Sequence, residues 1–155
     1  MRQRSEMQIS QEIEQLRKLA GGFRAAVLLT DPADVDPEVR FIVVDFPRGV
    51  CGAICFLLGH YLIENGFPSP EYVNGIRAAD RQSHAWIEVN GIIVDITADQ
   101  FLEIDEGVVV STDRSWHQQF SDKPGRRPAD FLIYGDSSPH GLAYGPIVKN
   151  IRCTP

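Results

Sequence analysis

The feature that most constrains the fold is a pair of apolar segments joined by Asn90 and Gly91. Residues 84–89 alternate between apolar and other side chains, and residues 92–97 are rich in β-branched side chains. Asn-Gly is the pair that two-residue hairpin turns favour, because both central positions need positive φ. The sequence therefore predicts an antiparallel β-hairpin here.

The hairpin register brings a histidine close to a carboxylate. If the turn has two residues, Trp86 pairs with Asp95, and His84 pairs with Thr97 on the returning strand. His84 and Asp95 are then diagonal neighbours on one face of the sheet. A carboxylate in that position would fix the orientation and the tautomer of an imidazole base.

Residues 51–65 show helical periodicity instead. Apolar side chains recur three and four positions apart, and Gly66 stands where a C-terminal cap belongs. The helix is apolar on most sides, so we expect a central, buried element. Cys51 would lie in its first turn, where backbone N–H groups lack intrahelical partners and the helix dipole favours an anion. Both effects favour the nucleophilic thiolate.

The three cysteines have different interpretations. Gly49 and Gly52 leave room for a substrate carbonyl beside Cys51, and the N–H of Cys51 or Gly52 could bind a developing oxyanion. The alternative is that Cys51 is a small buried apolar residue, as free cysteines often are. Cys55 lies one turn later among apolar neighbours and is predicted to be core. Cys153 lies in the tail and carries little information.

Composition narrows the class of protein. The chain has 155 residues, which suits a single domain over residues 1–155, and its formal net charge is −6. A negative charge argues against a general nucleic-acid binder. No apolar run is long enough to span a bilayer and no signal peptide is visible, so we expect a cytoplasmic protein or one exported without such a signal. An odd, sparse set of cysteines argues for a reducing compartment.

The rest of the pattern completes an α+β order, with helices followed by hairpin strands. The helical and irregular segments expected from residue type are a helix over 9–23, an acidic connector over 30–37, and loops over 77–83 and 137–145. The extended segments expected are 41–46, a short strand near Tyr72 and Val73, and strands over 107–111 and 131–134. The tail, 147–155, is left unassigned.

Three blocks of the chain resemble the transglutaminase-like branch of the papain-like cysteine enzymes. Gly49-Val50-Cys51 opens the central helix, His84-Ala85-Trp86-Ile87-Glu88-Val89 forms one strand, and Val94-Asp95-Ile96-Thr97 forms the next. The family pattern is similar: G-x-C at a helix start, then H-x-W-x-E-V, then D-x-T. The resemblance covers residues 46–101, and residues 105–155 match no family pattern.

The resemblance implies a papain/transglutaminase-like fold and a Cys-His-Asp triad. Cys51 would be the nucleophile, His84 its base and Asp95 the residue that orients the base. The implied reaction is acyl transfer through a thioester on a protein or peptide amide, without a cofactor. Water as acceptor gives peptide or isopeptide hydrolysis or glutamine deamidation, and an amine gives transamidation. Such an enzyme could be a toxin or effector, or a housekeeping amidase.

The sequence does not identify the group that donates a hydrogen bond to the oxyanion. The family often has a bulky aromatic residue before the cysteine, and here Arg48 and Val50 occupy that region. Adjacency alone suggests Gly52, Arg48 and Trp86 as oxyanion or substrate-cleft residues.

Two other functions compete with the enzyme. Cys51 and Cys55, with His60 or His84, could hold Zn²⁺, although the spacing fits no common zinc motif. Alternatively, the chain is an inactive binding module on the same fold, with a partner surface that includes Phe131, Tyr134 and Tyr144. The remaining histidines, His60, His117 and His140, are interpreted as non-catalytic.

Overall fold

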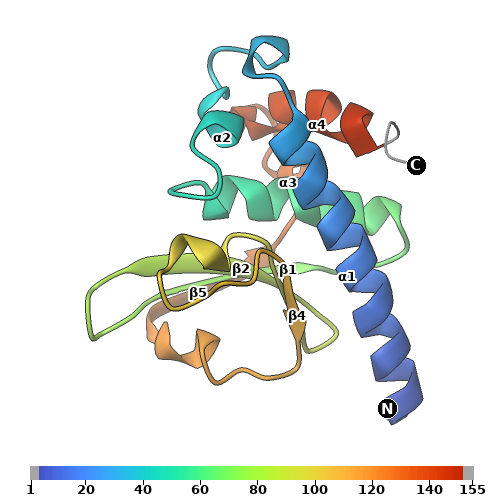
Figure 1. Cartoon of the computed structure of the whole chain (residues 1–155), viewed down its shortest axis with the longest axis vertical. Coiled ribbons are helices and arrows are strands. Elements are labelled where there is room, and N and C mark those ends of the chain that lie inside the picture. Colours follow the sequence, from blue (N-terminus) through green and yellow to red (C-terminus); the bar gives the residue numbers. More distant parts are fainter. Residues whose placement is uncertain (1–3, 152–155) are drawn as a thin grey trace.

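The structure of the chain, a computed structural model, describes residues 4–151. Its centre is an antiparallel sheet in the order β4-β3-β2-β1-β5, with helices packed against it (Figure 1). The strands are β1 (Glu71–Ile76), β2 (Ser83–Val89), β3 (Ile92–Asp95), β4 (Val109–Ser111) and β5 (Asp122–Pro128). The α-helices are α1 (Glu6–Leu29), α2 (Phe41–Val44), α3 (Cys51–Glu64) and α4 (Tyr144–Ile151). The predicted α+β class is confirmed.

The hairpin of β2 and β3 forms as predicted. Asn90 and Gly91 both have positive φ, 52° and 80°, as a type I′ turn requires. The ladder pairs Val89 with Ile92. This register places residues 84 and 95 on one diagonal at the end of the hairpin.

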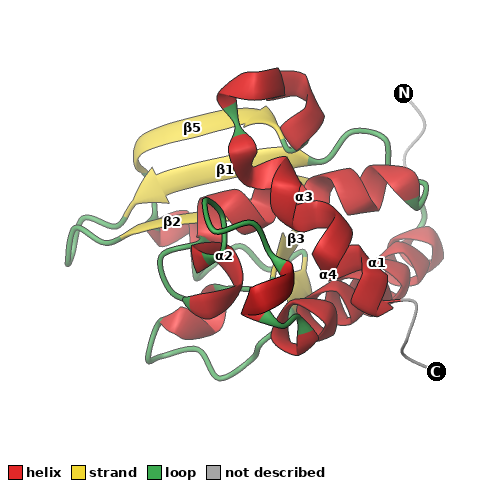
Figure 2. Cartoon of the chain, turned by 90° about the horizontal axis from the view of Figure 1, so that it is seen from above, coloured by secondary structure: helices red, strands yellow, loops and turns green. Residues whose placement is uncertain are grey.

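The central helix α3 begins at the predicted residue, Cys51, and lies over one face of the sheet (Figure 2). Gly66 follows it with a φ of +98°, a conformation that side chains other than glycine seldom adopt. The N–H of Phe67 then bonds the carbonyl of Leu62, which closes the helix end. Because α3 is buried against β1 and β2, its first turn is held at a fixed height above the sheet.

The first helix extends beyond the predicted 9–23 at both ends. Ser5 and Gln8 form a reciprocal capping box at its start. Ala26 and Val27 continue the buried stripe of α1 past the predicted end. Helix α4, in the tail left unassigned, packs against α1. The tail cysteine, Cys153, lies outside the described residues.

The prediction of an extended stretch over 41–46 is wrong, because residues 41–44 form the short helix α2. Ile42 is the member of this turn that is fully buried, whereas Phe41 and Val44 are exposed. Arg40 holds the preceding turn by donating to the carbonyls of Pro32 and Val35. These contacts outweigh the β preference of a β-branched run.

The predicted strand over 131–134 is also wrong, because a 3-10 segment, η4 (Phe131–Ser137), occupies it. Asp130 caps this segment by accepting from the N–H of Leu132. The predicted loop over 137–145 contains a second 3-10 turn, η5 (Pro139–Ala143), and the acidic connector contains η1 (Pro32–Asp34). The sequence analysis did not anticipate β5.

The two faces of the sheet have separate cores. The helices cover one face with the main aliphatic core. On the opposite face, in the region of the segment η3 (His117–Gln119), a second cluster is largely aromatic and consists of Val73, Trp86, Ile93, Phe101, Trp116 and Phe120. Within the described part of the chain, no helix is both long and apolar enough to span a membrane.

Candidate active site

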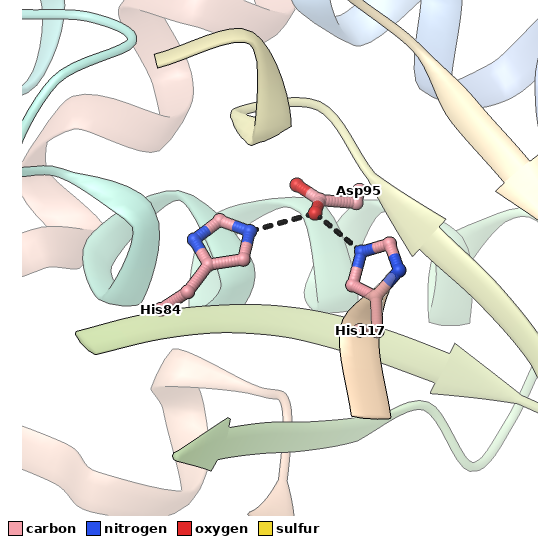
Figure 3. A group of neighbouring side chains, drawn as sticks. All are labelled: His84, Asp95 and His117. Carbon is pink, nitrogen blue, oxygen red and sulfur yellow. Dashed lines mark hydrogen bonds and ion pairs between the residues drawn. The ribbon is translucent and has the colours of Figure 1, made fainter. Parts of the chain in front are cut away.

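His84 and Asp95 meet at the end of the hairpin, as the register predicts. Nε2 of His84, near the start of β2, donates to Oδ2 of Asp95, the last residue of β3, at 2.7 Å (Figure 3). Both side chains are at most 1% exposed. A buried hydrogen bond of this kind fixes the imidazole ring and leaves Nδ1 on the side away from Asp95.

Further donors hold the Asp95 carboxylate in place. The backbone N–H of Thr97 bonds Oδ1 at 3.0 Å, which explains why the D-x-T spacing suits this site. Nε2 of His117 donates to Oδ2 at 2.8 Å, so two imidazoles share one oxygen (Figure 3). Burial raises the pKa of Asp95, but the charge of His84 and the hydrogen bonds of both histidines outweigh it. The net result is a pKa far below the ordinary range of an aspartate.

Cys51 is partly exposed at the first position of α3 and lies near His84. Burial raises the pKa of its thiol. A hydrogen bond with His84, the charge of His84 and the backbone N–H of Ala85 oppose burial, and together they lower the pKa of Cys51 below that of an ordinary thiol. The uncapped helix start adds its dipole to these contacts.

His84 responds in the opposite direction. Burial lowers its pKa, but the charge and hydrogen bond of Asp95, followed by those of Cys51, raise it to about 9. A lowered pKa on the thiol and a raised pKa on the imidazole are the directions of shift that favour a thiolate–imidazolium pair.

Four aromatic rings pack around His84. Its ring centroid lies between 5.1 and 5.8 Å from the centroids of four rings, those of Phe101, Phe120, Trp116 and Trp86. The second core therefore fixes the imidazole ring and excludes water from its pairing with Asp95.

The three residues suggested as cleft or oxyanion groups lie in different surroundings. Gly52 directly follows Cys51 in the first turn of α3. Arg48 is exposed in the turn before the helix. Trp86 is only 5% exposed and lies in the second core, where it packs behind His84.

Two side chains at the site were missed by the sequence analysis. His117 was interpreted as non-catalytic, yet it bonds Asp95 directly. Gln100, in the short turn η2 (Ala98–Gln100), places Nε2 3.4 Å from Nδ1 of His84. The proximity of Gln100 to the D-x-T block was a usable signal. No local pattern distinguished His117, because its contact depends on how a long loop folds back.

Although Cys51 lies near His84, the cysteines and histidines of the zinc hypothesis form no group of three potential ligands among residues 4–151. Cys55 is buried in the core, as predicted, and burial holds the pKa of its thiol well above the usual value. His60 instead bonds Asp130 through Nδ1 at 3.1 Å. His140 packs against Phe41, and burial lowers its pKa.

Among the residues that the structure describes, the group that could offer metal ligands is His84, Asp95 and His117. Their N···O distances of 2.7 and 2.8 Å are hydrogen-bond lengths, and both nitrogens are directed at the same oxygen. Metal ligation needs lone pairs that converge on a point about 2 Å from each ligand atom. This geometry fits a proton-sharing network better than an ion site.

Comparison of the chain with protein-family models, with curated proteins and with solved structures found no match.

Proposed function

We propose that this protein is a cysteine enzyme of the papain/transglutaminase-like type, which transfers acyl groups through a thioester at Cys51. The observation that carries the proposal is the position of His84 between two partners. Its Nε2 bonds Asp95 at 2.7 Å, and the ring lies close enough to the Cys51 thiol to lower the pKa of that thiol. A thiol, an imidazole and a carboxylate in this order form the relay that cysteine nucleophiles use.

The reaction follows from the protonation states at the site. The Cys51 thiolate attacks the carbonyl carbon of an amide, the C–S bond forms, and the carbonyl electron pair moves onto oxygen. When the tetrahedral intermediate collapses, the proton on His84 passes to the leaving amine. His84 then removes a proton from the acceptor, which attacks the thioester and releases Cys51. Water as acceptor gives hydrolysis or deamidation, and an amine gives transamidation.

The test is the rate at which iodoacetamide alkylates Cys51, in protein that carries Cys153→Ser to simplify the assignment. At pH 6 we expect Cys51 to react at least about tenfold faster than glutathione, since the ion pair maintains thiolate where an ordinary thiol is protonated. His84→Ala should reduce the rate to that of glutathione. Mass spectrometry of the intact protein and its peptides gives both the rate and the site.

His60→Ala is the matched control, because it also removes a histidine that is paired with an aspartate, but on the far part of α3. It should leave the alkylation rate unchanged. Equal rates for Cys51 and glutathione would contradict the proposal and would favour a binding module, which has no need of a reactive thiol.

A further inference from the structure

Acyl transfer at Cys51 generates an oxyanion that must be stabilised. The first helical hydrogen bond of α3 is that from the N–H of Ile54 to the carbonyl of Val50. The N–H groups of Cys51, Gly52 and Ala53 therefore precede the helical ladder, and Val50 provides no side-chain cap. These groups supply one side of an oxyanion site, and a second donor is needed on the other.

Tyr72, on β1, brings a hydroxyl to this position. A Cβ atom placed on Gly52 would lie 3.7 Å from Oη of Tyr72 and 4.0 Å from Cε2 of its ring. The phenol end thus approaches α3 at the residue that follows the nucleophile, and the missing side chain of Gly52 leaves space between them. No described residue hydrogen-bonds the Tyr72 hydroxyl, so it is available to a ligand.

The ring that carries this hydroxyl is held firmly. It stacks on Phe56 with a centroid separation of 4.8 Å and an interplanar angle of 8°. The guanidinium carbon of Arg127 lies 5.0 Å from the ring centroid. Tyr72 is only 8% exposed. A donor fixed before the reaction costs no reorganisation when the oxyanion forms.

We propose that the Tyr72 hydroxyl donates to the oxyanion formed at Cys51, opposite the N–H groups of the first turn of α3. This inference rests on the proposed function. As the thiolate adds to the carbonyl carbon, the C=O π pair becomes a lone pair on oxygen, and the hydroxyl hydrogen-bonds that oxygen without transferring its proton. When the carbonyl reforms, the leaving group departs and the hydroxyl is unchanged.

The protonation state of Tyr72 suits a donor. Burial, followed by the charges of Cys55 and Cys51, raises its pKa to about 12 against a smaller opposing effect of Arg127. The hydroxyl therefore keeps its proton throughout the range in which the ion pair of Cys51 and His84 exists.

The experiment compares two reactions of the same thiolate. Hydrolysis of p-nitrophenyl acetate passes through an oxyanion, and p-nitrophenolate leaves without needing a proton from His84. Alkylation by iodoacetamide displaces iodide from a saturated carbon and forms no oxyanion. For Tyr72→Phe we expect acylation to slow by about a hundredfold and alkylation to stay within about twofold, since one donor is lost and the thiolate is untouched.

Tyr61→Phe is the matched control, because it removes a hydroxyl from a tyrosine of α3 whose ring packs on Phe23. Ester hydrolysis by Tyr72→Phe at the rate of this control would overturn the role of Tyr72 and leave the proposed function standing. A parallel fall of acylation and alkylation would also overturn it, because Tyr72 would then act on the thiolate. If the wild-type protein releases p-nitrophenolate no faster than Cys51→Ala does, both proposals are wrong.

Gly52→Ala provides a second variant if Tyr72→Phe does not fold. Its new methyl group makes ordinary van der Waals contact with the Tyr72 hydroxyl but fills the space that the oxyanion would occupy. We expect it to fold and to lose acylation. Wild-type rates of ester hydrolysis by Gly52→Ala would count against an oxyanion between these two groups.

Discussion

At the scale of single residues, Asp95 determines the electrostatics of the site. It is fully buried as a carboxylate, which is tolerable because Thr97, His84 and His117 all donate to it. Its charge helps to raise the pKa of His84 to about 9, and the charge of His84 in turn lowers the pKa of Cys51. The pKa of the thiol therefore depends on Asp95 through the imidazole between them.

Asp95→Asn tests this relay through its pH dependence. The raised pKa of His84, about 9, depends on the Asp95 charge, so without it burial dominates and the pKa falls. Between pH 6 and 8 the imidazolium is then lost. The pH dependence of the Cys51 alkylation rate should therefore shift to higher pH, toward that of an ordinary thiol. Asp130→Asn, which affects the His60 pair, is the control. Identical pH profiles for wild type and Asp95→Asn would contradict the relay.

At the scale of elements, the height of α3 above the sheet depends on a close backbone approach at Gly59. A Cβ atom at this position would lie 1.7 Å from the carbonyl oxygen of Ala129, which follows β5. A glycine here therefore allows the helix and the segment after β5 to pack in contact. The same packing positions the first residue of α3 beside β2.

Gly59→Ala should lower the free energy of unfolding by at least about 2 kcal/mol, because backbone atoms have to move to admit the methyl group. Gly22→Ala, in α1, is the matched control, since no atom lies within 4 Å of its new methyl group. It should raise stability by about 0.5 to 1 kcal/mol through helix propensity. Urea unfolding measures both free-energy changes. Equal changes in the two variants would show that the close backbone approach does not exclude a side chain at position 59.

At the scale of the whole molecule, Arg24 joins three segments that are remote in sequence. From α1 its guanidinium pairs with Asp99 at 2.8 Å and donates to the carbonyls of Ile96 and Gly107. Its guanidinium carbon also lies 5.1 Å from the ring centroid of Phe46. The N-terminal helix is thereby linked to the segment before Cys51 and to the segment after Asp95.

Arg24→Lys keeps the charge but loses the planar fork, so it should cost about 2 to 3 kcal/mol of unfolding free energy. Cys51 alkylation should slow as well, because the nucleophile and the aspartate that orients its base adjoin the segments that Arg24 joins. Arg17→Lys is the control, since Arg17 makes a single bond to the carbonyl of Val110. Urea unfolding and the alkylation rate are the two measurements. If the Arg24→Lys protein is destabilised but Cys51 is alkylated at the normal rate, Arg24 contributes to stability and not to the geometry of the site.

The sequence by itself determined those features that depend on local interactions. The Asn90-Gly91 turn selects one register, and that register alone brings His84 to the diagonal of Asp95. Helical periodicity likewise placed the start of α3 at Cys51, and Gly66 marked its end. Turn geometry and residue period act over a few residues, so they can be read without knowledge of the rest of the chain.

Only the tertiary structure decided which distant groups complete the site. His117, Tyr72 and Arg24 make their contacts because loops and helices fold back on one another, and no short pattern encodes those contacts. The predicted strand over 41–46 failed for the same reason, and the one over 131–134 failed because a short-range cap was missed. In both places a local preference for extended structure is overruled by burial of one side chain, or by a cap supplied from a neighbouring residue.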